Sequence, residues 1–294
     1  MSEDSPDRTE FFMRHQTRLR ALGYRLLGSV SDAEDIVQEA YLRWSKAEPA
    51  HLDQPAAYLS RIVTRLCIDH LKSARARRET YVGPWLPEPL VAATEWTADS
   101  EAGVAHDVSY AFILLLDRLS PAERAAFVLH DVFGLTFEDI AATLDRTPAS
   151  CRQLASRARM QLRPAPDTTP ATTAKPEHPA AGAFIAALKS GDIEGLRRSL
   201  TADAVLVSDG GAKVRAARRP ILGREKIARM FARLSAENYR PHDLLPAVIN
   251  GLPGLVVRTA AGIAGTFAFE MEGDRIHRVY VVRNPEKLRH LAAR

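Results

Sequence analysis

The sequence contains little cysteine and has no long apolar run. Cys67 and Cys151 are its two cysteines, and neither has a partner at metal-ligand spacing. A disulfide framework and a zinc module are therefore excluded, and we expect no metal or other cofactor. No stretch approaches the roughly 18 apolar residues that a membrane span needs, and residues 1–10 are polar and acidic, unlike a signal peptide. We therefore expect a cytoplasmic protein without a membrane partner.

The net charge is small because it averages two different halves. The 294 residues include 40 Lys+Arg and 36 Asp+Glu, a formal charge of +4. Residues 1–165 carry 20 basic and 23 acidic side chains, net −3, and residues 166–294 carry 20 and 13, net +7. Because 46% of the residues are apolar, collagenous and disordered classes are excluded. At roughly 100–200 residues per domain, we expect two or three domains.

Two proline clusters divide the chain. Residues 81–90 contain three prolines, and residues 164–179 contain five prolines and four threonines without a large apolar residue. Proline removes backbone donors and favours extended linkers. The predicted organisation is a packed segment at 8–80, a linker at 81–102, a packed segment at 103–163, a linker at 164–179 and a packed segment at 180–294.

The first two packed segments are predicted to be all-α. Residues 31–34 and 120–123 both fit the capping box Ser-x-x-Glu, which begins a helix. The third segment contains helical stretches at 183–188, 192–200 and 224–234. They are combined with largely apolar runs separated by turns, and the last of these runs is at 276–282. This order predicts an α+β domain with a curved antiparallel sheet.

A helix-turn-helix is predicted over residues 134–159. Ile140 and Leu144 lie on the apolar face of its first helix, and Thr147 and Pro148 suit the N-cap and first position of the second. A basic helix alone is usually just solvated, but the preceding turned helix favours DNA binding, because arginine can bind guanine edges or phosphates. The DNA-binding candidates of this motif are Arg146, Arg152, Gln153, Ser156, Arg157 and Arg159.

A second basic helix is predicted at 55–79. It carries six basic and two acidic side chains inside a net negative half. A helix that lies along DNA phosphates has this composition. A helix whose C-terminal cations only interact favourably with the helix dipole has the same composition. Its predicted DNA face includes Thr64 and Ile68 among the cations. The DNA-binding candidates are Arg61, Arg65, Lys72, Arg75, Arg77 and Arg78.

An acidic helix precedes it at residues 32–44. Its apolar side chains lie on one face, so the opposite face would repel DNA and attract a basic protein. A solvated surface is the usual explanation of such a run, but the neighbouring DNA-binding helices favour a protein partner. The candidates for that contact are Asp32, Asp35, Gln38 and Glu39.

These helices, in this order, resemble a bacterial RNA polymerase sigma factor of the extracytoplasmic function (ECF) group, from about Phe11 to Arg163. The resemblance implies a region 2 helical bundle whose acidic helix binds core RNA polymerase and whose basic helix faces the minus-ten promoter element. It implies that residues 119–162 are region 4 and bind the minus-thirty-five element. The loop at 46–54 would hold a flipped base, since opened promoters need protein in place of lost stacking.

Three short segments resemble the signatures of the sigma-J type subgroup with a fused SnoaL-like domain. They comprise Trp85, Leu86, Pro87, Glu88 and Pro89; Asp209, Gly210, Gly211 and Lys213; and Asn284, Pro285, Glu286, Lys287 and Leu288. A third glycine is usual in place of Ala212, which leaves open a positive backbone angle there, and an aspartate is usual in place of Glu286.

The resemblance implies that residues 180–294 form a cone-shaped regulator that contacts the linker or the sigma regions, with Trp85 as its anchor. Trp85 could instead be a linker aromatic that covers region 2. The cone's sheet-lined pocket could hold a small-molecule ligand. Catalysis is not expected, because no spacing forces two of the scattered acid/base candidates into one site. These candidates are Asp203, Asp209, His242, His277 and His290.

The function that we expect is transcription initiation: directing core polymerase to specific promoters under the control of the C-terminal domain. A helix-turn-helix regulator with a ligand-sensing C-terminal domain is the first alternative. It would bind duplex promoter DNA without polymerase, and the acidic helix argues against it. The second alternative is an enzyme fused to a DNA-binding module.

Overall fold

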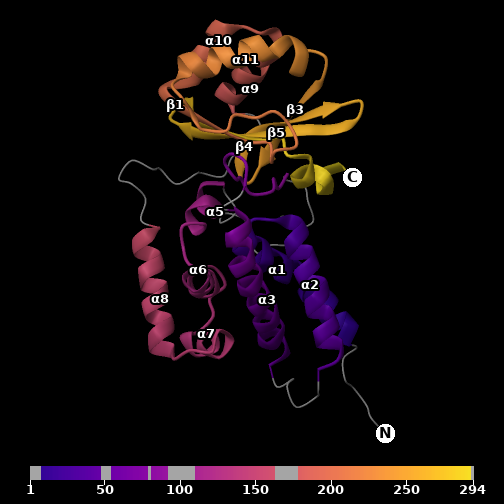
Figure 1. The fold of residues 1–294 in the computed structure, drawn as a ribbon, viewed down its shortest axis with the longest axis vertical. Helices are drawn as coiled ribbons and strands as arrows, with labels where there is room; N and C mark the ends of the chain where they lie inside the picture. Colours follow the sequence, from indigo (N-terminus) through magenta and orange to yellow (C-terminus); the bar gives the residue numbers. More distant parts are fainter. Residues whose placement is uncertain (1–7, 48–53, 79–80, 92–109, 163–177, 293–294) are drawn as a thin grey trace. The chain divides into compact units, whose positions relative to one another are not determined.

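The computed structural model describes residues 8–47, 54–78, 81–91, 110–162 and 178–292, without the side chains of 74–78 and 292. The chain forms two compact units, which we describe separately (Figure 1). Unit 1 comprises residues 1–79, 95–107 and 111–165, and unit 2 comprises residues 80–94, 108–110 and 166–294. The proline-rich segment after residue 80 therefore belongs to the C-terminal unit and is not a free linker.

Unit 1 begins with three packed helices, α1 (Arg8–Leu27), α2 (Val30–Ser45) and α3 (Pro55–Arg78). Their apolar stripes form a common core that includes fully buried Leu26 and Leu59. The capping box predicted at residues 31–34 is wrong. Helix α2 begins two residues earlier, because the extended Ser29 accepts a hydrogen bond from the Asp32 amide (3.1 Å).

The second half of unit 1 contains the predicted helix-turn-helix. Helix α5 (Tyr110–Leu116) is followed by α6 (Pro121–Phe127), the π-helix η3 (Val128–Val132), α7 (Phe137–Leu144) and α8 (Pro148–Gln161). The capping box at Ser120 is confirmed. Asp145 adopts a left-handed conformation (φ 54°) at the end of α7, and Thr147 caps α8, which turns the chain between the two helices.

Unit 2 contains a six-stranded sheet with helices on one face (Figure 1). The helices are α9 (Pro179–Ser190), α10 (Ile193–Ser199) and α11 (Arg224–Asn238). The strands are β1 (Leu200–Asp209), β2 (Ile221–Leu222), β3 (Asp243–Ile249), β4 (Leu252–Thr259), β5 (Gly262–Glu272) and β6 (Arg275–Val282), in the order β2-β1-β6-β5-β4-β3. The 3-10 helix η4 (Pro285–Leu288) and α12 (Arg289–Ala292) follow.

The antiparallel sheet that the sequence predicts contains one parallel pair of strands. Strands β1 and β6 run parallel, whereas each other neighbouring pair is antiparallel. The reason is topological, because β1 joins the sheet beside the last strand of the β3–β6 meander, far away along the chain. Parallel neighbours require such a long crossover connection.

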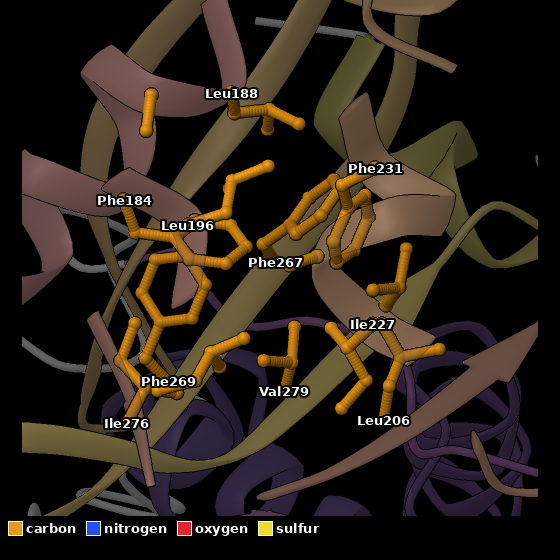
Figure 2. Close-up of a cluster of buried hydrophobic side chains, with 14 of the residues drawn as sticks. Phe184, Leu188, Leu196, Leu206, Ile227, Phe231, Phe267, Phe269, Ile276 and Val279 are labelled. Carbon is orange, nitrogen blue, oxygen red and sulfur yellow. The ribbon is translucent and has the colours of Figure 1, made fainter. Parts of the chain in front are cut away.

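The inner face of the sheet and the helices enclose an aromatic core (Figure 2). Phe184 from α9 and Phe231 from α11 meet edge to face, with ring centroids 5.5 Å apart. Phe267 and Phe269 of β5 pack against them, and all four side chains are at most 1% exposed. These rings fill the part of the cone where a sheet-lined ligand pocket was expected, so this core offers no support for a small-molecule ligand there.

Candidate nucleic-acid and polymerase surfaces and the linker clasp

The polar face of α8 is exposed as predicted. Its buried stripe is formed by Cys151, Ala155 and Ala158, and the DNA-binding candidates lie opposite it in solvent. Two of these arginines have acidic partners inside unit 1. Arg152 lies 3.3 Å from a Glu138 oxygen, and Arg159 makes two bonds to Asp131 (2.9 and 3.1 Å). DNA would have to replace these exposed ion pairs, which are individually weak.

The remaining candidates of this motif have no such competition. Arg146, Gln153, Ser156 and Arg157 are exposed. Neither Arg146 nor Arg157 makes an ion pair with any residue that the structure describes. They are therefore free to contact phosphates, which position a protein on DNA without selecting sequence.

We predict that Arg152→Ala and Arg159→Ala each weaken promoter binding by about 1–3 kcal/mol for every base contact removed. The measurement is binding of the holoenzyme to a promoter fragment that it transcribes, compared with a fragment whose minus-thirty-five element is scrambled. Arg118→Ala is the matched control, because Arg118 is an exposed arginine outside the helix-turn-helix. Equal losses on both fragments would show that the two arginines bind phosphates rather than bases.

The basic face of α3 is less open than predicted. Thr64 is fully buried, so it is not part of a DNA-binding surface. Arg65 donates to the carbonyl oxygens of Thr143 (2.9 Å) and Ala142 (3.2 Å) at the end of α7. The end of a helix leaves such carbonyls without intrahelical partners, and a guanidinium suits both their geometry and the helix dipole.

The other cations of α3 differ in their surroundings. Arg61 is half-buried, whereas Lys72 is exposed and lies 3.1 Å from Asp69 on its own helix. The side chains of Arg75, Arg77 and Arg78 lie outside the described residues, as does most of the predicted base-capture loop. The part of the basic helix that the structure describes is thus partly engaged with the helix-turn-helix.

A second arginine also links the two halves of unit 1. Arg124 of α6 is 2% exposed and donates to the carbonyl oxygen of Leu26 at the end of α1 (2.8 Å). Its other terminal nitrogen lies 2.8 Å from the Asp117 carboxylate. Together with Arg65, this contact makes unit 1 a closed arrangement in which the helix-turn-helix packs on the three-helix bundle.

The acidic face of α2 is exposed at three of its four candidates. Asp35, Gln38 and Glu39 lie in solvent, and Glu39 pairs with Arg43 one turn later (2.9 Å). Asp32 instead lies at the edge of this face, 3.4 Å from the His70 ring on α3. Leu42, which sequence reasoning did not select, is 53% exposed on the same face as Glu39. An apolar side chain among charged ones is typical of a protein interface.

In unit 2, the three signature segments meet at the carboxylate of Asp209, which is completely buried. One oxygen accepts from the Tyr81 hydroxyl (2.6 Å). The other accepts from the Leu86 amide (2.9 Å) and the Lys287 ammonium (2.7 Å). The structure thus joins the linker, the end of β1 and the C-terminal segment. We call Tyr81, Leu86, Asp209, Asn284 and Lys287 the linker clasp.

The buried polar groups of the clasp have several hydrogen-bond partners. Lys287 also donates to the Leu86 carbonyl, and its nitrogen lies 4.4 Å from the centroid of the Trp85 ring. Asn284 donates to the Tyr81 hydroxyl (3.0 Å). Burial and the hydrogen bond to Asp209 raise the pKa of Tyr81 above its ordinary value, so the phenol remains a donor. A buried ion pair needs such additional hydrogen bonds to offset the cost of removing its charges from water.

The two glycines of the second signature are required because neighbouring atoms lie too close to leave room for a side chain. A Cβ on Gly210 would lie 2.5 Å from the Val214 carbonyl oxygen, and one on Gly211 would lie 2.1 Å from the Asn284 amide nitrogen. Gly211 also has a positive φ of 56°. Ala212, where a third glycine is usual, nevertheless adopts a φ of 58°. The left-handed turn is therefore retained without the glycine.

The other signature residues surround the clasp. Lys213 is exposed and lies 3.4 Å from a Glu286 oxygen. Pro285 and Leu288 belong to η4, and Leu288 is 3% exposed. Leu86 is fully buried, whereas Trp85 is only partly buried, so Leu86 rather than Trp85 is the deeper anchor of the linker.

Sequence reasoning missed a second set of contacts that holds the linker on the outer face of the sheet. The backbone of Leu90 exchanges two hydrogen bonds with Asn250, at 2.8 and 2.9 Å. The His290 ring is bonded to the Pro89 carbonyl oxygen (2.8 Å). The ring of Tyr110, at the start of α5, stacks on Tyr280 of β6 with centroids 5.3 Å apart. Tyrosines and a hairpin asparagine are common elsewhere, so nothing local in the sequence marks these contacts.

Beside the clasp, the turn after β1 borders a cavity of about 310 Å³. Val82 and Gly83 form one side of the cavity, and Gly210–Arg218 form much of the rest. Among the helices that the structure describes, none is long and apolar enough to cross a membrane.

Comparison with known proteins places this arrangement in a family. Residues 11–77 match Sigma-70 region 2, and residues 109–162 match Sigma-70, region 4. The ECF RNA polymerase sigma factor SigJ of Mycobacterium tuberculosis (strain ATCC 25618 / H37Rv) is 36% identical over 92% of this chain and 89% of that protein. The probable ECF RNA polymerase sigma factor SigI of the same strain is 30% identical over 95% of this chain and 94% of that protein.

The crystal structure of Mycobacterium tuberculosis SigJ superposes on the chain with a TM-score of 0.72 at 32% identity, covering 96% of this chain and 98% of that chain. Similarity over more than nine-tenths of the chain does not favour the helix-turn-helix regulator as an alternative, and sigma factors are not an enzyme family. The chain belongs to the ECF RNA polymerase sigma factors and is of the SigJ type.

Proposed function

We propose that this sigma factor directs core RNA polymerase to its promoters under the restraint of its own C-terminal unit, which holds the linker by the clasp. The observation that carries the proposal is the buried Asp209 carboxylate, which binds Tyr81 and Leu86 of the linker and Lys287 of the C-terminal segment. We assign polymerase binding to Asp35, Gln38 and Glu39, with Asp32 at their edge. We assign promoter binding to the arginines of α8, their polar neighbours and the cations of α3.

Promoter binding requires unit 1 to open. The minus-ten and minus-thirty-five elements are about 25 base pairs apart, or about 85 Å of B-DNA. In the closed arrangement, Arg65 of α3 bonds directly to the end of α7. Helix α3 and the helix-turn-helix therefore cannot bind both elements until this contact is broken. When this contact breaks, Arg65 loses its bonds to the α7 carbonyl oxygens and can bind DNA phosphates instead.

The linker clasp opposes this opening. The chain between α3 and α5 is held on unit 2 near both ends, by the clasp at Tyr81 and Leu86 and by the stacking of Tyr110. Because both attachment points are held on the same unit, we expect regions 2 and 4 to remain at high effective concentration for each other. Weakening the linker contacts should shift the population toward the open, polymerase-competent form.

Run-off transcription with core polymerase tests both parts of the proposal. The wild-type chain should give promoter-specific transcripts only when core enzyme is present. Asn250→Gly keeps a residue that tolerates the φ of 48° but removes the side-chain bond to Leu90. Losing about 1–2 kcal/mol of restraint should raise the transcript yield by about 5- to 30-fold when sigma factor is limiting.

Asp274→Gly is the matched control, because it removes an exposed polar side chain from the hairpin turn between β5 and β6. Its transcript yield should equal that of the wild type. No promoter-specific transcript from any variant would contradict the sigma-factor role. Equal yields from Asn250→Gly and Asp274→Gly, at equal folded concentration, would contradict the restraint alone.

A further inference from the structure

We propose that Asp203, Glu272 and His277 form a binding site for a divalent transition-metal ion, with Zn²⁺ as the best-fitting probe. Their ligand atoms all lie within 4.8 Å of one another. The His277 Nδ1 is 3.8 Å from an Asp203 oxygen and 3.7 Å from a Glu272 oxygen. The site lies in unit 2, away from the linker clasp.

Backbone irregularities on both sides of His277 create this cluster. Along β5, Glu270 pairs with Arg278 and the next residue, Met271, pairs with Ile276, so His277 is an extra residue in β6. Along β1, the register jumps from the Leu200–Ile276 pair to the Val205–Arg278 pair, which leaves residues 201–204 beside His277. Bulges redirect side chains, and here both bring carboxylates toward one imidazole.

The distances fit a metal ion better than direct contact between the side chains. Both imidazole–carboxylate distances exceed hydrogen-bonding range. A tetrahedral Zn²⁺ with bonds of about 2.0–2.2 Å holds its nitrogen and oxygen ligands about 3.4 Å apart. The two imidazole–carboxylate separations of 3.7 and 3.8 Å need only small side-chain rotations to reach this value, and the Asp203 and Glu272 oxygens, within 4.8 Å of each other, must also move together. One imidazole with two carboxylates is also a ligand set that zinc accepts.

The surroundings provide support and access. Thr201 is hydrogen-bonded to Asp203, which lowers the pKa of that carboxyl. Its hydroxyl is also hydrogen-bonded to the His277 Nδ1 (3.4 Å), a contact that a metal ion on this nitrogen would replace. A partner of this kind orients a ligating carboxylate. The side chains of Asp203 and Glu272 are 74% and 60% exposed. An ion can therefore enter from solvent, and water can complete its coordination.

A bound ion would join the start of β1 to the β5–β6 hairpin. Strand β1 ends at Asp209 and β6 leads to Asn284, so the same two strands carry the metal site at one end and the linker clasp at the other. An ion that binds only the folded state stabilises it by mass action.

Calorimetric titration of the metal-free, full-length protein with ZnCl2 at pH 7.5 tests the proposal. The wild-type chain should bind one equivalent with a measurable heat and unfold at a higher temperature with zinc than without it. His277→Gln and Glu272→Gln should each weaken binding at least about 10-fold, because each removes one ligand. MgCl2 should not compete, since it prefers an all-oxygen octahedral site.

His242→Gln controls for adventitious binding to other histidines and should bind zinc as the wild type does. Circular dichroism of each zinc-free variant identifies any that fails to fold, and Glu272→Gln changes an exposed side chain that contributes nothing to the core. Zinc binding by the folded variants that equals wild type would overturn the proposal. No binding by the wild type would overturn it as well.

Discussion

Reversing Asp35 and Glu39 to lysine will abolish binding to core RNA polymerase while leaving the helix bundle folded. Both side chains are exposed on α2, so neither contributes to the core. The change replaces two negative charges with two positive ones on a surface assigned to a basic partner. Juxtaposed like charges cost several kcal/mol, so we expect at least a 100-fold loss of affinity, about 3 kcal/mol, in a pull-down or titration of core enzyme.

The fold should survive this reversal. It removes the exposed Glu39–Arg43 pair, and such helical pairs contribute only about 0.3–0.5 kcal/mol. The control reverses Glu237 and Asp274, which are exposed in unit 2, and so changes the net charge by the same amount. Undiminished capture of core enzyme by the α2 variant would refute this surface. An equal loss in the control would show that net charge, rather than α2, controls binding.

Replacing Lys287 with methionine will lower the free energy of unfolding of unit 2 by about 3–5 kcal/mol. The reason is that the completely buried Asp209 carboxylate would lose the ammonium 2.7 Å away. Urea denaturation of the full-length protein, followed by fluorescence, measures the loss. Trp85 reports on the clasp directly, because Lys287 lies over its ring.

Two further variants identify the cause of that loss. Combining Lys287→Met with Asp209→Asn removes both charges and should recover more than half of the lost stability, since no uncompensated charge remains. Lys213→Met breaks an ion pair in which both side chains are at least half exposed, and should cost less than about 1 kcal/mol. A Lys287→Met loss no larger than that of Lys213→Met would contradict a buried, energetically important clasp.

Much of the fold could be predicted because its signals are local. The helix-turn-helix is marked by residues that act on their immediate neighbours, such as Thr147, which caps α8 through the Ser150 amide (3.2 Å). The strands of unit 2 likewise follow from apolar runs between glycine turns. The exception among local signals is Ser29, which caps α2 through the Asp32 amide although the Ser-x-x-Glu pattern points to Ser31.

The contacts that were missed depend on distant partners. Arg65 has the composition of a phosphate-binding residue, and nothing near it in the sequence indicates the Thr143 carbonyl 78 positions away. The hydrogen bond between Leu90 and Asn250 joins residues that are 160 positions apart in the sequence. The resemblance to a family identified which segments matter but not how they meet. The sequence marks His277 only as one of several scattered acid/base candidates, because the bulges that surround it arise from strand register.

The position of residues 81–91 in unit 2 limits how this regulator can be transferred between proteins. The outer face of its sheet is covered by a segment that lies before region 4 in the chain, with Leu86 fully buried and Leu90 6% exposed. Appending residues 180–294 to another sigma factor would leave that face bare and prone to aggregation. A working transplant would have to include the proline-rich segment too. Residues 81–91 and 180–294 therefore form one structural module, although region 4 lies between them in the sequence.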